Sequence, residues 1–466
     1  MVQLPARLLS ARLAGPVGRK SRSGFCPDGV EPRDASIPND RHDIVEKETG
    51  RKNMTDVVLE NARIFDGHSA DCAEGMSVLV EDGFIREVSD HPIRAADVRR
   101  IDVGGKTLMP GLIDLHVHAY FSDLNAKLVD SRDAPYRTAH AVKKLGHALD
   151  CGFTTVRDIG GGDYSLASAI EDKLIRAPRF FYAGKVLSMT GGHVDYRTPN
   201  EKYHTHGYCS CGSMNWGGVV VDGVDECIKA AREELRRGAH CIKIVASGGV
   251  MSPSDPMWMN QFREDETRAI VNECTERRTY VSAHCHPVSS IRRSIEFGVR
   301  CIEHATLIDA ETAQFVAERG AFVVPTMSVI FVTMEVGAAL GMTADGMAKL
   351  KIAAEAAIEG LQHMRDAGVK MGFGTDLLGS TYDQQCREFE FRREVFTPLE
   401  MLRQATSLGA EILMQEGKLG CVRPGAHADL IVVDGDPLMD IGLLAADGRK
   451  LDLIMRAGEI VKNRLD

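Results

Sequence analysis

Eight short apolar runs constrain the fold of this chain more than any other feature of its sequence. They are LIDLHVHAY (112–120), FTTVRDIGG (153–161), RFFYAGKVLSM (179–189), CIKIVASGG (241–249), YVSAHCHP (280–287), CIEHATL (301–307), AFVVPTMSV (321–329) and KMGFGTD (370–376). Helix-like segments lie between several of them, such as VDECIKAAREELRRGA (224–239) and REDETRAIVNECTERR (263–278). Continuous apolar strands that alternate with helices are typical of α/β proteins with a buried parallel sheet. We therefore predict a (β/α)8 TIM-like barrel, whose working face lies at the carboxyl ends of the strands.

A doubly wound open sheet is the structural alternative. The loop DIGGGDY (158–164) follows the second run, as a nucleotide-binding loop would. Its glycines do not have the spacing of a dinucleotide fingerprint, so the barrel is preferred.

Strand and turn signals also occur at both ends of the chain. DVVLENARIFDG (56–67) and SVLVEDGFIREVSD (77–90) contain Asp-Gly pairs suited to tight turns, and ADLIVVDGDPL (428–438) and LDLIMRAGEIVKN (451–463) resemble them near the C-terminus. We predict that residues 54–111 and 416–466 form one small β-sandwich domain, with the barrel at 112–415 between them.

The first 53 residues differ from the rest. Residues 1–27 contain four arginines, one lysine, three serines and no acid, a composition typical of a mitochondrial transit peptide. The alternative, which we prefer, is that Met54 is the true start. Disorder is expected in this segment in both cases.

Composition limits the possible partners. The chain has 466 residues, of which 44% are hydrophobic, and a net charge of −10, so neither nucleic acid nor an anionic membrane is an expected partner. We expect a cytoplasmic protein (mitochondrial if the leader is a transit peptide) that acts on a small molecule. Cys241, Cys285 and Cys301 lie inside apolar runs and are predicted to be unpaired, buried thiols.

Polar side chains stand at the ends of several runs. His116 and His118 are two positions apart in a strand, so both imidazoles face the same side. Four further candidates are Lys243, His284, His304 and Asp376. Each alone has an ordinary explanation, such as a hydrogen-bonded histidine or a helix cap, but their shared placement favours a divalent metal site.

These motifs resemble the amidohydrolase superfamily, in the branch of imidazolonepropionase-like hydrolases, metal-dependent prolidases, Xaa-Arg/Lys dipeptidases and ochratoxin amidases. The similarity extends over about residues 56–461. It is carried by PGLIDLHVH, GFTTVRDIGG, IKIVASGG, AHCH, IEHAT, GFGTD and PGAHADLIVVDGDPL, in the order of the family.

The resemblance implies two divalent ions, Zn²⁺ first and Mn²⁺ or Co²⁺ as alternatives. His116, His118 and Asp376 would hold one ion, and His284 and His304 the other. Lys243 would carry a CO₂-derived carbamate that bridges the pair, because an ammonium beside two dications would be repelled. A bridging hydroxide would attack the scissile carbonyl, with Asp376 as general base and then general acid.

The implied reaction is the hydrolysis of an amide C–N bond, and the first choice of substrate is a dipeptide or an N-acyl amino acid. The alternatives within the class are a xenobiotic amide, carbamate or urea, and a cyclic amide ring. A non-catalytic barrel scaffold is an alternative of another kind. Candidate substrate contacts are His193, His286 and Tyr203, the last in a long segment after the third run. A homo-oligomer is possible.

Overall fold

The computed structural model describes residues 56–197, 216–252 and 255–465. The residues from Asn53 to Asp466 form one compact unit. The leader, together with the alternatives of a transit peptide and a start at Met54, lies outside the described residues.

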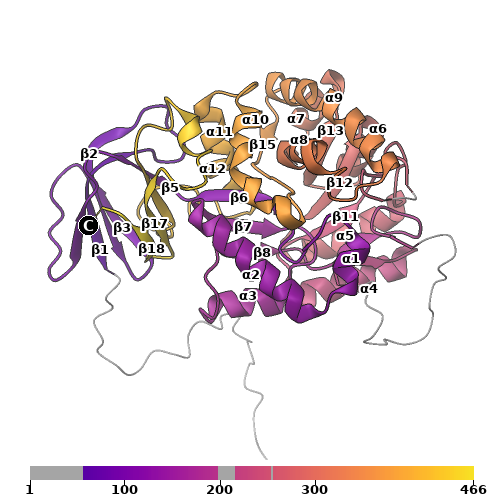
Figure 1. Cartoon of the computed structure of the whole chain (residues 1–466), viewed down its shortest axis with the longest axis horizontal. Helices are drawn as coiled ribbons and strands as arrows, with labels where there is room; N and C mark the ends of the chain where they lie inside the picture. Colours follow the sequence, from indigo (N-terminus) through magenta and orange to yellow (C-terminus); the bar gives the residue numbers. More distant parts are fainter. Residues whose placement is uncertain (1–55, 198–215, 253–254, 466) are drawn as a thin grey trace, which may run out of the picture. The chain divides into compact units, whose positions relative to one another are not determined.

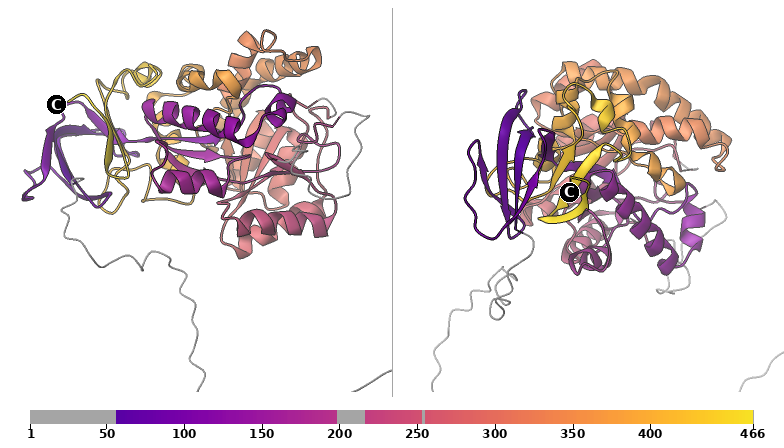
Figure 2. Two further views of the ribbon diagram at one scale, coloured as in Figure 1. Left: turned by 60° about the horizontal axis from the view of Figure 1, so that its bottom comes forward. Right: turned by 60° about the vertical axis from the view of Figure 1, so that its left-hand side comes forward.

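Both ends of the described chain contribute to one mixed sheet. Its eight strands are β1 (Val57–Ile64), β2 (Ala73–Glu81), β3 (Phe84–Ser89), β4 (Arg99–Asp102), β5 (Thr107–Pro110), β16 (Leu430–Val433), β17 (Leu451–Arg456) and β18 (Glu459–Asn463). Their order is β18-β17-β16-β5-β1-β2-β3, with β4 paired to β1. Figures 1 and 2 show the indigo N-terminal strands beside the yellow C-terminal ones. The two ends meet in this sheet, whereas the sandwich form and the domain boundaries stay predictions.

Parallel strands form in all eight predicted runs. They are β6 (Leu112–Val117), β7 (Phe153–Asp158), β8 (Arg179–Tyr182) with β9 (Val186–Ser188), β11 (Ile242–Val245), β12 (Val281–Pro287), β13 (Cys301–Leu307), β14 (Phe322–Val324) and β15 (Lys370–Met371). A short β10 (Gly218–Val220) adds to β9. The sheets have the orders β6-β7-β8 and β10-β9-β11-β12-β13-β14-β15, so the strands follow one another in chain order except for β10, which lies at the outer edge of β9.

The third run was expected as one strand, but it is divided between the two sheets. Gly184, between β8 and β9, has a φ of 74°, a backbone conformation that favours glycine. A Cβ there would lie 2.1 Å from the Glu234 carboxylate, so only glycine fits at this point. β8 pairs with β7, and β9 pairs with β11.

Individual backbone hydrogen bonds link the last run to the first. The Leu115 amide donates to the Phe373 carbonyl at 2.8 Å, and the Asp376 amide donates to the His116 carbonyl at 2.8 Å. Gly374 permits this close approach, because a Cβ on it would lie 2.9 Å from the His116 Cβ. The segment after β15 therefore lies directly against β6.

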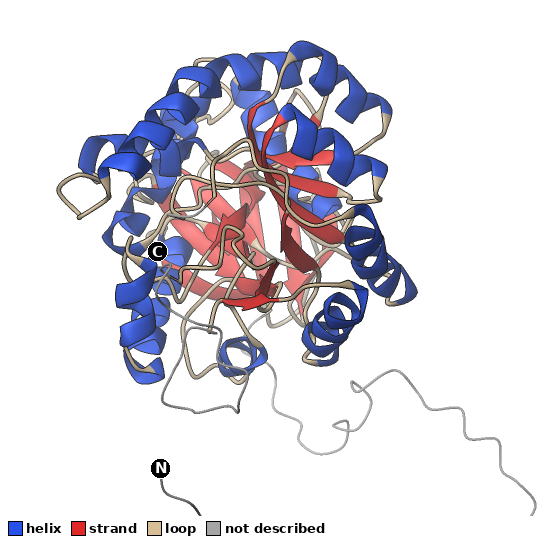
Figure 3. Cartoon of the chain, turned by 90° about the vertical axis from the view of Figure 1, so that its right-hand side faces the viewer, coloured by secondary structure: helices blue, strands red, loops and turns tan. Residues whose placement is uncertain are grey.

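Helices surround the parallel strands (Figure 3). They are α1 (Ala126–Ser131), α2 (Ala134–Asp150), α3 (Tyr164–Glu171), α4 (Val224–Arg236), α5 (Glu264–Glu276), α6 (Val288–Glu296), α7 (Ala310–Glu318), α8 (Met327–Val336), α9 (Ala344–Asp366), α10 (Glu388–Arg392), α11 (Pro398–Gln404) and α12 (Ser407–Ile412), with 3₁₀ turns η1 (Gly379–Arg387) and η2 (Ile441–Leu443). The result is an α/β, TIM-barrel-like fold. Within the described residues, no helix has the length and apolar content needed to cross a bilayer.

The predicted thiols are buried and unpaired. Cys241, Cys285 and Cys301 are fully buried in the strands, and all cysteines of the described ranges are free. This agrees with their interpretation as small apolar residues.

A fully buried arginine braces the strand ends next to Asp376. The Arg392 guanidinium donates to Glu388 Oε1 at 2.7 Å, to the Pro325 carbonyl at 2.6 Å and to the Gly372 carbonyl at 3.0 Å. Glu388 in turn accepts hydrogen bonds from the backbone amides of Met327 and Ser328 at the start of α8. The pair thus joins α10, α8 and the ends of β14 and β15.

We expect Arg392→Met to lower the free energy of unfolding by about 3–5 kcal/mol, because it leaves the Glu388 carboxylate buried without its cation. Urea denaturation measures the change. Arg393→Met is the matched control, since Arg393 is exposed and its loss should change stability by no more than about 0.5 kcal/mol. Equal stability of the two variants would contradict the bracing role.

Candidate active site

One cavity of about 420 Å³ receives all six residues that the sequence predicts as metal ligands. His116, His118, Lys243, His284, His304 and Asp376 all line it. Four strands (β6, β11, β12 and β13) or their carboxyl ends supply the first five of these side chains, and the segment after β15 supplies the sixth. The rest of the wall is largely apolar and includes Phe121, Leu124, Val186, Val194, Trp216, Val250, Met251, Leu340 and Met342.

Both histidines of the first strand are fixed through Nδ1. His118 Nδ1 donates to the Gly160 carbonyl at 2.8 Å, and His116 Nδ1 lies 2.7 Å from Glu303 Oε2. Both Nε2 atoms face the same carboxylate: Asp376 Oδ1 is 3.5 Å from His116 Nε2 and 3.2 Å from His118 Nε2. When each neutral imidazole carries its proton on Nδ1, the lone pairs of the two Nε2 atoms face the Asp376 carboxylate, which is also an acceptor.

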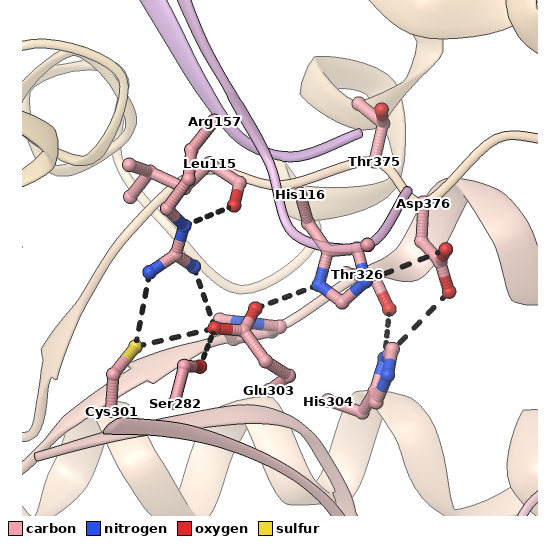
Figure 4. A network of polar contacts seen from close by, with 12 residues as sticks. Leu115, His116, Arg157, Ser282, Cys301, Glu303, His304, Thr326, Thr375 and Asp376 are labelled. Atoms are coloured by element: carbon pink, nitrogen blue, oxygen red, sulfur yellow. Dashed lines mark hydrogen bonds and ion pairs between the residues drawn. The ribbon is translucent and has the colours of Figure 1, made fainter. Parts of the chain in front are cut away.

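A buried ion pair below His116 holds its ring (Figure 4). Arg157 Nη2 lies 2.6 Å from Glu303 Oε1, and both side chains are inaccessible to solvent. Ser282 Oγ also donates to Glu303, while Arg157 Nε donates to the Leu115 carbonyl at 2.7 Å. Burial raises the pKa of Glu303, but Arg157, Lys243 and His116 together outweigh this effect and lower the pKa below its ordinary value. Glu303 is therefore an ionised carboxylate that orients His116.

A second buried carboxylate fixes the segment that carries Asp376. Asp114 accepts hydrogen bonds from Thr375 Oγ1 and Gln385 Nε2, both at 2.7 Å, and from the His116 amide at 3.0 Å. Burial raises the pKa of Asp114 to about 6. The same residue thus positions both the first strand and the residue before Asp376.

Two of the cavity residues have an unusual backbone conformation. His304 has a φ of 71° and Asp376 a φ of 55°, both in the left-handed region that L-residues seldom adopt. Such conformations cost about 1–3 kcal/mol each and persist where surrounding contacts enforce them. For His304, one such contact is the 2.8 Å hydrogen bond between Nδ1 and Thr326 Oγ1.

Burial governs the charge of the other residues. It lowers the pKa of His116 to about 4 and lowers the pKa values of His284 and His304 well below the ordinary value. It also lowers the pKa of Lys243. Asp376 and His118 are the exceptions: burial raises the pKa of Asp376, but His116 and His118 together lower it, so this carboxylate is ionised. Burial lowers the pKa of His118, but the neighbouring Asp376 carboxylate raises it above its ordinary value. Neutral imidazoles beside an ionised carboxylate are the donor forms that a divalent cation requires.

The geometry fits a metal ion. Ligand atoms of His116, His304 and Asp376 lie within 4.8 Å of one another. The buried His284 Nε2 has no hydrogen-bond partner among the described residues, an arrangement that a protein rarely leaves uncompensated. A cation would satisfy this nitrogen and the acceptors that converge near Asp376.

The predicted substrate contacts differ in their placement. His193 lines the cavity, with its ring stacked on that of His284 at 4.6 Å between centroids. His286 does not appear among the lining residues; it is buried, with Nδ1 3.1 Å from Thr306 Oγ1. Tyr203 lies outside the described residues. The substrate-binding roles of all three stay predictions.

Several supporting residues were not identified from the sequence: Arg157, Glu303, Asp114, Thr326 and Tyr196, which also lines the cavity. A signal was available for the first three, because each is a charged residue inside a run that is otherwise apolar.

Comparisons with known proteins identify the family. The sequence profile of the Amidohydrolase family matches residues 107–461. Ochratoxinase of Aspergillus niger is 31% identical over 366 residues, which is 76% of this chain and 75% of that protein. A solved amidohydrolase is 44% identical, with a TM-score of 0.86 over 88% of this chain and 100% of the other. A prolidase complexed with N-methylphosphonate-L-proline is 41% identical, with a TM-score of 0.85 over the same shares.

The family profile covers most of the chain, and the cavity contains histidines and an ionised aspartate at the ends of its strands. The sequence comparison and the geometry of the site therefore agree. The chain therefore belongs to the amidohydrolase family and is a hydrolase that acts on amide carbon–nitrogen bonds.

Proposed function

We propose that this protein is a binuclear metal-dependent amidohydrolase that cleaves the amide bond of a dipeptide or an N-acyl amino acid. The observation that carries the proposal is the convergence of four histidines, a buried lysine and an ionised aspartate on one cavity. The similarity to a prolidase supports a peptide-like substrate. A scaffold without catalytic activity would not need this set of groups.

The residues would hold two ions. His116, His118 and Asp376 would bind one, and His284 and His304 the other, with a carbamate on Lys243 between them. When bound, the ions would acidify a water molecule and polarise the scissile carbonyl. Burial supports the carbamate because it lowers the pKa of Lys243, and a neutral amine is the form that reacts with CO₂.

Asp376 moves the proton in this proposal. Its carboxylate is ionised and lies next to both Nε2 atoms of the first strand, so it accepts the proton of the attacking water. It then delivers this proton to the leaving nitrogen. His193, at the wall of the cavity, binds the substrate carbonyl or carboxylate.

We further propose that the parallel strands close into the full (β/α)8 barrel. The hydrogen bonds that join Leu115 to Phe373 and His116 to Asp376 support closure between the first and last runs. A hydrogen bond of 2.8 Å from the His240 amide to the Tyr182 carbonyl joins β8, in one sheet, to the residues just before β11, in the other. Closure brings the first and last ligand segments together.

A second candidate substrate is a bulky apolar amide, carbamate or urea. The apolar wall formed by Phe121, Trp216, Met251 and other residues favours it, since a free dipeptide needs few such contacts. The similarity to ochratoxinase also supports this class. A small-molecule substrate, a cytoplasmic location and a homo-oligomer remain part of the proposal.

The substrate prediction is tested by a hydrolysis screen with Zn²⁺, Mn²⁺ or Co²⁺ supplied. We expect turnover of dipeptides or N-acyl amino acids, measured as release of the free amine. Faster hydrolysis of aryl amides, carbamates or ureas would transfer the assignment to the second candidate. No hydrolysis of any amide by metal-loaded protein would refute the proposed function.

Lys243→Ala should reduce the metal content from about two ions per chain to about one, because the carbamate bridge is lost. We expect activity to fall on the order of 10²-fold or more. Metal analysis and turnover measure the two effects. The control is Lys229→Ala on α4, an exposed lysine whose loss should change neither. Two bound ions and normal turnover in Lys243→Ala, without added short carboxylic acids, would exclude the carbamate role.

Asp376→Asn should lower kcat by about 10²–10⁴-fold, since the amide cannot accept the proton of the attacking water. Circular dichroism should show that the fold is kept. Asp383→Asn is the control, because Asp383 is exposed on η1 and its loss should change kcat by less than about twofold. A wild-type kcat in Asp376→Asn would end the assignment of this residue as the proton carrier.

A further inference from the structure

We propose that Asp255 is a positioning residue that holds His193 in its substrate-binding orientation. The inference rests on the proposed function for the role of His193, whereas the contacts that carry it are independent of that function. Asp255 is completely buried, although it belongs to the connection between β11 and α5 and not to a strand end.

The His193 ring is held on more than one side. It stacks on His284 with centroids 4.6 Å apart and planes 20° apart. Gly249 also lies against it, because a Cβ on Gly249 would be 2.3 Å from His193 Cε1. The ring therefore has room for only a narrow range of orientations.

The Asp255 carboxylate lies beside Nδ1 of that ring. Its Oδ2 lies 3.4 Å from His193 Nδ1 and accepts a hydrogen bond from Gln261 Nε2 at 2.9 Å. Gln261 Oε1 accepts a hydrogen bond of 3.1 Å from the backbone amide of His193. One carboxylate thus contacts the side chain of His193 directly and its backbone through Gln261, so Nδ1 points toward Asp255.

The position of Asp255 is itself fixed by the wall of the cavity. Lys349 on α9 donates to the Ser252 and Asp255 carbonyls, at 3.0 and 3.2 Å. The beginning of α9 lines the cavity through Thr343 and Gly346. Asp255 therefore links His193 to α9, whose beginning lines the same cavity.

A double-mutant cycle tests the proposal on the best amide substrate of the wild-type enzyme. Asp255→Asn should raise KM about tenfold and change kcat less, because the substrate contact of His193 is misplaced. In the His193→Ala background, Asp255→Asn should change kcat/KM by less than about twofold, since its effect passes through a ring that is no longer present. If the two substitutions lower kcat/KM by independent factors that multiply in the double variant, the proposal is overturned.

The matched control is Asp429→Asn. Asp429 is also buried and paired, with Arg179 at 3.1 Å, but it lies beside the terminal sheet. Its effect on kcat/KM should be the same with and without His193. A coupling between Asp429 and His193 as large as that of Asp255 would contradict a specific link.

A crystal structure of Asp255→Asn gives a readout without turnover. We expect the His193 ring to leave its stack on His284, and a ring that keeps this stack would overturn the proposal. If Asp255→Asn does not fold, Asp255→Ala removes the same carboxylate and the same outcomes apply. Should the wild type hydrolyse no amide, the proposed function fails, while the ring position still decides the role of Asp255.

Discussion

The buried ion pair between Arg157 and Glu303 is the interaction on which the site depends. Two charges removed from water are stabilising only if their geometry is close and their other hydrogen-bonding atoms are satisfied. Here Glu303 also contacts His116 and Ser282, and Arg157 contacts the Leu115 carbonyl. The pair joins β7, β13 and β6 at the floor of the cavity. It costs desolvation energy and in return fixes the ring that faces Asp376.

The sequence predicted the parts of the site that stand out along the chain. His116 and Lys243 lie within apolar runs and Asp376 ends one, and the strand ends of an α/β fold meet at one side. The supporting ion pair could not be predicted, because Arg157 and Glu303 are 146 positions apart and a single charge in an apolar run does not identify its partner. The division of the third run escaped prediction for a local reason, the left-handed backbone at Gly184.

Backbone conformation is a second property that the side-chain pattern does not reveal. His304 and Asp376 were chosen as ligands from their position after apolar residues, and this pattern says nothing of their positive φ. A left-handed residue interrupts the regular strand geometry and turns its side chain away from the direction that the alternation of a strand would give. In β13, the register against β12 shifts between the pairs Cys285–His304 and Pro287–Leu307. The conformation of His304 is held by the hydrogen bond between its ring and Thr326. That of Asp376 is held by the hydrogen bond from its backbone amide to the His116 carbonyl.

The contrast between floor and wall explains how one cavity serves both binding and chemistry. The floor consists of the candidate metal ligands, of which His116, His118 and His304 are held by hydrogen bonds. The wall is made of side chains such as Phe121, Val186 and Met251. A substrate that covers the floor with its apolar part would exclude water, which strengthens each electrostatic contact at the scissile bond. A wall without this apolar character would leave the Asp376 carboxylate screened by solvent and less able to direct a proton. In the proposed mechanism, the apolar residues would therefore contribute to the reaction itself as well as to the choice of substrate.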